Sequence, residues 1–110
     1  MNRYGICKWL EKKVRARDRD CVYCGVTLTE ASPKGNKKRN GTWEHINNDE
    51  WDSEDIDYMK FNVVRCCTVC NSSKGAKSLR DWLDSPYCVK RKIDQKMAPV
   101  VKRFLRMFSE

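Results

Sequence analysis

Two pairs of cysteines have the spacing of a metal site. Two residues separate Cys21 from Cys24, and two residues separate Cys67 from Cys70. This gap lets both thiolates of a pair reach one tetrahedral ion at about 2.3 Å. Four thiolates leave no open coordination position, so the four cysteines predict a structural zinc site. The ion would close a long loop, because 42 residues separate the two pairs.

The other three cysteines lack this spacing. Cys66 directly precedes Cys67, so a small change of register would bring Cys66 into the site instead. Cys7 and Cys88 are interpreted as unpaired, partly buried thiols. The N-terminal residues lack the apolar run of about 7–15 residues that a signal peptide needs. We therefore expect a reducing compartment, where clustered cysteines bind metal more often than they form disulfides.

A second group consists of residues whose side chains can move protons or bind a divalent ion. Glu44 precedes His45, the one histidine of the chain, and Asn62 and Asn71 follow. An imidazole with a pKa of about 6.5 suits a general base at neutral pH. Carboxylate and amide oxygens suit Mg²⁺ or Mn²⁺ better than catalytic zinc. A lone histidine is more often structural than catalytic, so the interpretation depends on the neighbours of His45.

These residues stand in the order of a known motif. In chain order its elements are Arg-Asp-x-x-Cys-x-x-Cys-Gly at 17–25, Glu44-His45, Asn62, and Cys-Asn-x-x-Lys-Gly at 70–75. Together they resemble the HNH endonuclease family, in its His-Asn-Asn variant, over roughly residues 17–80. The resemblance implies the ββα-metal fold of that family, here a small zinc-stabilised α+β domain with flanking N- and C-terminal helices.

The resemblance also implies roles in cleaving DNA to 5′-phosphate and 3′-hydroxyl ends. His45 would be the general base. Glu44 and Asn71 would hold one divalent ion, Mg²⁺ or Mn²⁺. Asn62 would fix the loop between the strands and thereby aim His45. Lys74 lies one helical turn after Asn71 and would reach a phosphate oxygen.

Three positions depart from the common family pattern. Many members have Asp or His where this chain has Glu44, and histidine where it has Asn71. The proline that commonly follows the histidine is missing, and Asn47 and Asn48 occupy its place. The extra methylene of a glutamate moves the carboxylate by about 1.5 Å. Asp49 is therefore a substitute ligand if Glu44 points away.

The charge of the chain favours a polyanionic partner. Its 110 residues contain 23 Lys and Arg against 15 Asp and Glu, a formal net charge of +8. Six of the acids lie between Asp49 and Asp57, so the rest of the chain is much more basic. This excess favours nucleic acid, and double-stranded DNA is the expected partner. The candidate contacts are Lys37, Lys38, Arg39, Lys74 and Lys77.

A single domain over residues 1–110 must position these groups, since the length allows one modest core. Apolar spacing and turn residues predict helices at 6–19 and 71–84, further helices over 85–108 that Pro99 divides, and strands at 42–46 and 61–65. The acidic residues 47–60 are expected to form an exposed loop. In the first helix, Ile6, Trp9, Leu10 and Val14 share one face. A C-terminal apolar stripe from Val100 to Phe108 is expected to pack on the core.

Two other functions are open at this point. One is a catalytically inactive zinc-stabilised module that binds nucleic acid. The other is an RNA-binding zinc protein of ribosomal type, which leaves Glu44, His45 and Asn62 without a role. Whether the C-terminal stripe forms a homodimer is also open. No run of about 20 apolar residues predicts a membrane span, so the expected location is the cytoplasm. The resemblance to HNH endonucleases implies that this is the cytoplasm of a bacterium or of a phage host.

Overall fold

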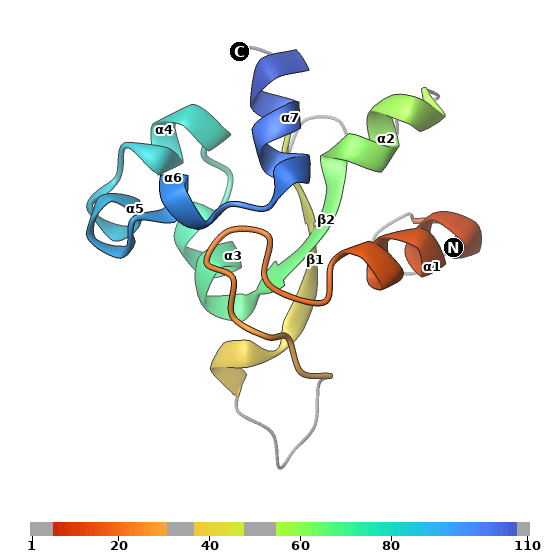
Figure 1. Cartoon of the computed structure of the whole chain (residues 1–110), viewed down its shortest axis with the longest axis horizontal. Coiled ribbons are helices and arrows are strands. Elements are labelled where there is room, and N and C mark those ends of the chain that lie inside the picture. The colour runs from red at the N-terminus through yellow and green to blue at the C-terminus, as the bar shows by residue number, and fades with distance from the viewer. Residues whose placement is uncertain (1–5, 31–36, 48–54, 108–110) are drawn as a thin grey trace.

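The computed structural model describes residues 6–30, 37–47 and 55–107. Helices surround a short sheet at the centre of the molecule (Figure 1). The elements are α1 (Lys8–Arg17), the 3-10 turn η1 (Lys37–Arg39), β1 (Gly41–His45), α2 (Ile56–Asn62), β2 (Val63–Cys67), α3 (Thr68–Lys74), α4 (Leu79–Leu83), α5 (Pro86–Arg91), α6 (Ile93–Lys96) and α7 (Pro99–Met107).

The two strands pair antiparallel, with Gly41 opposite Cys67 and His45 opposite Val63. Residues opposite each other share a face of the sheet, and successive residues alternate between faces. His45 and Val63 therefore face one side, whereas Glu44 and Val64 face the other. This alternation divides the core into two parts.

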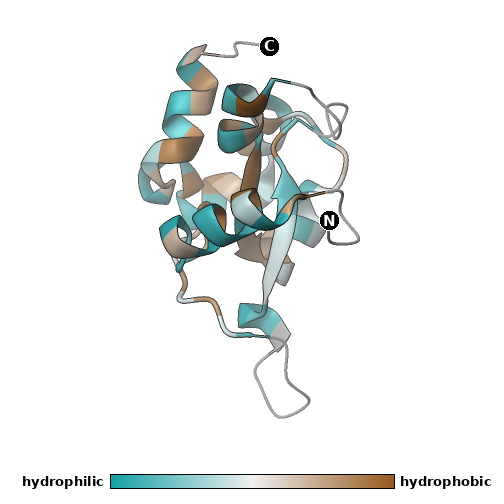
Figure 2. Ribbon diagram, turned by 90° about the vertical axis from the view of Figure 1, so that its right-hand side faces the viewer, coloured by the Kyte–Doolittle hydropathy of each residue, from teal (hydrophilic) through white to brown (hydrophobic). Residues whose placement is uncertain are grey.

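The smaller part of the core lies between the sheet and α1. Ile6, Leu10 and Val14 recur every four residues and pack against Trp43 and Val63. The spacing matches one face of a helix, which explains why this segment is amphipathic. Figure 2 shows hydrophobic and hydrophilic residues alternating along the helices.

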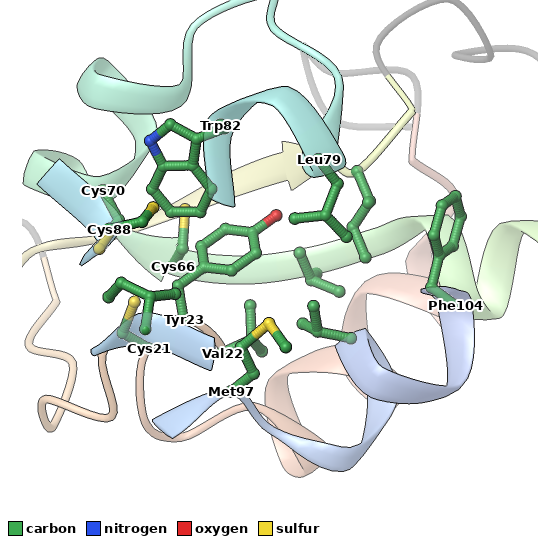
Figure 3. Close-up of a cluster of buried hydrophobic side chains, with 14 of the residues drawn as sticks. Cys21, Val22, Tyr23, Cys66, Cys70, Leu79, Trp82, Cys88, Met97 and Phe104 are labelled. Carbon is green, nitrogen blue, oxygen red and sulfur yellow. The ribbon is translucent and has the colours of Figure 1, made fainter. Parts of the chain in front are cut away.

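The larger part of the core covers the opposite face of the sheet. Figure 1 places α1 on one side of the sheet and α4, α5 and α6 on the other. Figure 3 shows Tyr23 and Trp82 at its centre, with Cys21 and Cys70 at one end and Phe104 at the other. Helix α7 contributes Val101 and Phe104, which are buried three residues apart.

A buried carboxylate joins the end of α1 to β2. The Asp18 side chain is buried and accepts the backbone N–H of Arg65 at 3.2 Å. Its neighbour Arg17 donates to the carbonyl of Lys60 at 2.7 Å and to that of Val63 at 2.9 Å. The Arg-Asp pair of the sequence motif therefore anchors α1 to the sheet.

The α+β class is confirmed, and both expected strands are present. The second strand begins at Val63 rather than at residue 61. The expected loop at 47–60 is wrong from residue 56 onward, because the Asp55 carboxylate accepts the Tyr58 N–H and begins α2. Residues 48–54 lie outside the described part of the chain.

The expected helix at 71–84 is divided into α3 and α4. Gly75, at a φ of 52°, ends α3, and Ser78 accepts the N–H of Asp81 to begin α4. A positive φ suits glycine. The expected start at Ser85 is confirmed, since its hydroxyl accepts the N–H of Cys88.

The expected N-terminal helix is confirmed, although it is shorter than 6–19 and leaves Trp9 46% exposed. The C-terminal stripe packs on the core as expected up to Leu105, and Phe108 lies outside the described residues. Among the described helices, none is both long and apolar enough to cross a membrane.

Candidate metal centre and active site

The four cysteines of the two C-x-x-C pairs come together. The sulfurs of Cys21, Cys24, Cys67 and Cys70 all lie within 4.8 Å of one another. The Cys24 and Cys67 sulfurs are 3.8 Å apart. A tetrahedral zinc–thiolate site requires about this separation between its sulfurs. The residues therefore fit a zinc ion, and within the described part of the chain this is the one such cluster of Cys, His, Asp and Glu.

Backbone contacts explain why the pairs meet. In each pair the second cysteine's N–H points to the first sulfur, at 3.5 Å for Cys24 and 3.4 Å for Cys70. The Val22 N–H donates to the carbonyl of Arg65 at 3.3 Å. The first pair is thus held against the end of β2, which leads directly into the second pair.

The register of β2 decides between Cys66 and Cys67. Cys66 is fully buried on the face of the larger core, and its burial raises the pKa of its thiol well above the usual range. Hydrogen bonding with Cys21 lowers the pKa of Cys67 to about 7. Cys67, and not Cys66, belongs to the group of four cysteines that could hold a metal ion, as the spacing predicts. Cys88 is buried and Cys7 is half-buried, and neither belongs to the cluster.

Glu44 points into the larger core, where its carboxylate meets Tyr23 and Lys74. Its side chain is 4% exposed, and its Oε2 accepts the Tyr23 hydroxyl at 3.3 Å. The Lys74 ammonium lies 3.7 Å from the same oxygen. Burial outweighs the attraction of Lys74 and the Tyr23 hydrogen bond, so the pKa of Glu44 is raised to about 7.

His45 is the last residue of β1, and its side chain lies on the other face from Glu44. It is 1% exposed, and burial lowers its pKa to about 4. The imidazole is therefore neutral at neutral pH, which is the form that accepts a proton. Because Glu44 and His45 lie on opposite faces of the sheet, a phosphate that both residues serve would have to lie at the end of β1, where both faces are within reach.

Asn62 holds the backbone immediately after His45. Its Oδ1 accepts the Asn47 N–H at 2.6 Å, and its Nδ2 donates to the Asn47 carbonyl at 3.3 Å. The Ile46 N–H donates to the carbonyl of Asn62 at 2.8 Å. Three hydrogen bonds therefore set the path of the chain where it leaves His45.

Asn71 and Lys74 both lie on α3, but they are placed differently. Asn71 is half-buried, and in the described residues no hydrogen bond joins its side chain to Glu44. Lys74 is 0% exposed and donates to the Ile46 carbonyl at 3.0 Å. The Lys74 ammonium is therefore enclosed by the core and faces Glu44, and its expected phosphate contact stays a prediction.

The other basic candidates lie near the surface. Lys38 and Arg39 are exposed in η1, and Lys37 shares this turn, although its side chain is outside the described part. Lys77 is exposed and donates to the Ser73 carbonyl at 3.1 Å. Asp49, the substitute ligand for Glu44, lies outside the described residues.

No protein-family model, curated protein or solved structure matches the chain. The resemblance to HNH endonucleases therefore depends on the residues and contacts of this chain alone.

One residue of the site was missed by sequence reasoning. Tyr23 lies between two zinc-ligand candidates and has no role in the sequence analysis, yet its hydroxyl reaches Glu44. Its position inside the C-x-x-C pair was the available signal, because a side chain there is positioned by the metal site.

Proposed function

We propose that this protein is a metal-dependent endonuclease of the HNH type, which hydrolyses DNA to 5′-phosphate and 3′-hydroxyl ends. The contact between Asn62 and Asn47 carries the proposal. The hydrogen bonds are those expected of an asparagine that aims the histidine at the end of the first strand. A purely structural zinc domain does not need this arrangement.

In this proposal each residue has a distinct task. His45 takes the proton from the attacking water, for which its neutral imidazole is already in the correct form. Asn62 keeps the backbone beyond His45 in place. The four cysteines hold a structural zinc, which stabilises the fold and takes no part in the reaction.

Glu44 and Asn71 would hold Mg²⁺ or Mn²⁺. Both known contacts of the Glu44 carboxylate are to Oε2, and in the described residues Oε1 makes no hydrogen bond. The donor set is hard oxygen, which fits these ions. When bound, such an ion polarises the phosphate and stabilises the leaving oxygen.

The expected substrate is double-stranded DNA, bound through its phosphates. Lys38, Arg39 and Lys77 are exposed and supply charge without reading sequence. If these side chains bind DNA phosphates, the affinity for DNA should fall as the salt concentration rises.

The direct test uses supercoiled plasmid with the zinc-loaded protein and added Mg²⁺ or Mn²⁺. We expect nicked or linear product, which disappears with His45→Ala and without the divalent ion. Asn40→Ala is a matched control, because Asn40 contacts Thr29 and lies outside the site. An intact plasmid with the natural chain under all these conditions would overturn the proposal.

A specific observation favours a second candidate, a catalytically inactive nucleic-acid-binding module. The Lys74 ammonium already neutralises the Glu44 carboxylate in a buried ion pair, so Glu44 can be satisfied without any divalent ion. In that case the plasmid would be retarded on a gel but remain uncut, and His45→Ala would leave the retardation unchanged.

A further inference from the structure

Tyr23 links the cysteine cluster to Glu44. It lies inside the Cys21–Cys24 pair, and its side chain is fully buried. Its two neighbours in the chain are Val22, whose backbone is bound to β2 and to Ala98, and the zinc-ligand candidate Cys24. The position of the Tyr23 ring is therefore set by the conformation of the metal-binding turn.

Aromatic contacts join Tyr23 to the second cysteine pair. Its ring meets the Trp82 ring edge-on, with centroids 4.8 Å apart (Figure 3). Trp82 is anchored by its Nε1, which donates to Ser73 at 2.9 Å, and it stacks on Tyr87 at 6.0 Å. The Tyr87 hydroxyl lies 3.3 Å from the Cys70 sulfur. Both cysteine pairs thus contact one continuous row of rings.

The far end of Tyr23 meets the candidate metal ligand. Its hydroxyl donates to Oε2 of Glu44 at 3.3 Å, the oxygen that Lys74 also faces. Holding Oε2 fixes the rotation of the carboxylate and leaves Oε1 for a cation. A group that orients a metal ligand in this way commonly contributes 10-fold or more to metal affinity.

We propose that Tyr23 is a positioning residue that couples occupancy of the zinc centre to divalent-ion binding at Glu44. The proposal depends on the proposed function, because it requires an ion at Glu44. Zinc orders the Cys21–Cys24 turn, the turn places the Tyr23 ring, and the hydroxyl presents the carboxylate. Coupling of this kind is reciprocal, so an ion at Glu44 must also strengthen retention of zinc.

The first test measures Mn²⁺ binding by electron paramagnetic resonance in zinc-loaded protein, without substrate. Tyr23→Phe keeps the ring and removes the hydroxyl, so zinc content and melting temperature should stay close to those of the natural chain. We expect its Mn²⁺ dissociation constant to rise about 10-fold. Glu44→Gln shows how much of the bound Mn²⁺ depends on Glu44, because this variant should lose the Mn²⁺ that binds at the carboxylate and keep any Mn²⁺ that binds elsewhere.

The second test measures the rate of zinc release to a coloured chelator, with and without Mg²⁺. In the natural chain Mg²⁺ should slow release by about fivefold. In Tyr23→Phe that slowing should be lost. Tyr87→Phe is the matched tyrosine variant: it should release zinc faster, since it removes a hydroxyl beside Cys70, but keep the slowing by Mg²⁺.

The outcomes separate the two proposals. If the natural chain binds Mn²⁺ in a Glu44-dependent way and Tyr23→Phe binds it equally well with zinc retained, the coupling proposal is overturned and the proposed function stands. If the natural chain binds no Mn²⁺ at Glu44, both are overturned. Weaker Mn²⁺ binding together with loss of the Mg²⁺ effect in Tyr23→Phe supports the coupling.

Discussion

The guanidinium of Arg65 occupies the space beside Gly41 where any larger residue would place its β-carbon. An ideal β-carbon on Gly41 would lie 2.9 Å from the Arg65 Cζ. The Arg65 side chain cannot easily move away, because it is buried, stacks over Trp43 at 5.4 Å and pairs with Glu30 at 3.3 Å.

Gly41→Ala should therefore destabilise the protein by about 1–3 kcal/mol through overpacking. Urea unfolding at fixed pH measures the effect. In an Arg65→Met background, which removes the obstructing guanidinium, the same substitution should cost clearly less. Equal costs in both backgrounds would show that Arg65 is not the obstacle.

Substitution of adjacent cysteines should separate the zinc ligand from its neighbour. Cys67→Ser should lose zinc and remain unfolded, since structural zinc contributes about 10–16 kcal/mol, at least as much as a typical domain's total stability. Cys66→Ser should fold and retain zinc with a modest loss of stability. Zinc per chain by atomic absorption, together with circular dichroism, distinguishes them. If Cys66→Ser lost zinc and Cys67→Ser retained it, Cys66 would be the zinc ligand and the assignment of Cys67 would be wrong.

The pH dependence of stability should contain two opposing contributions. The folded pKa of Glu44 is raised from 4.5 to about 7, so this residue lowers stability as the pH rises through that window. The folded pKa of His45 is lowered from 6.5 to about 4, so this residue lowers stability as the pH falls through that window.

Variants should separate these contributions, each worth about 3 kcal/mol. Relative to the natural chain, Glu44→Gln should gain stability as the pH rises from 4.5 to 7. His45→Gln should gain relative stability as the pH falls from 6.5 to 4. Urea unfolding in zinc-loaded protein without Mg²⁺ measures both, and the comparison cancels protonation of the shared zinc thiolates. If the free energy of unfolding depended on pH in the same way in all three proteins, the shifted pKa values of Glu44 and His45 would be contradicted.

Asn62→Ala should affect both stability and cleavage. It removes both side-chain hydrogen bonds to Asn47, which should cost about 1–3 kcal/mol. Since the loss frees the backbone beyond His45, kcat for plasmid cleavage should fall more than KM rises. Single-turnover cleavage with Asn40→Ala as control checks this. A change in KM alone would assign Asn62 to substrate binding.

Local patterns in the sequence predicted the parts of the fold that depend on neighbours in the chain. The C-x-x-C pairs, the strand at 42–46 and the helix start at Ser85-Pro86 are set by spacing and by capping residues. Helix α2 escaped notice, because its acidic residues suggested a loop and its capping residue Asp55 lay within the charged run.

Burial of polar groups could not be predicted in the same way. The spacing of Lys74 correctly placed it one turn after Asn71, but whether that face meets solvent or core depends on how α3 packs against β1. The contact of Tyr23 with Glu44 likewise joins segments 21 residues apart in the chain. Such contacts depend on tertiary packing, which cannot be predicted from the spacing of residues within one segment.

The long loop between the two cysteine pairs has a consequence for the order of events during synthesis. Zinc cannot be held by four thiolates until Cys70 has emerged, although Cys24 emerges 46 residues earlier. At about 5–20 residues per second, the first pair waits roughly 2 to 9 seconds for the second. During this interval both thiols of the first pair stay without their metal, so a reducing environment matters most while the protein is still on the ribosome.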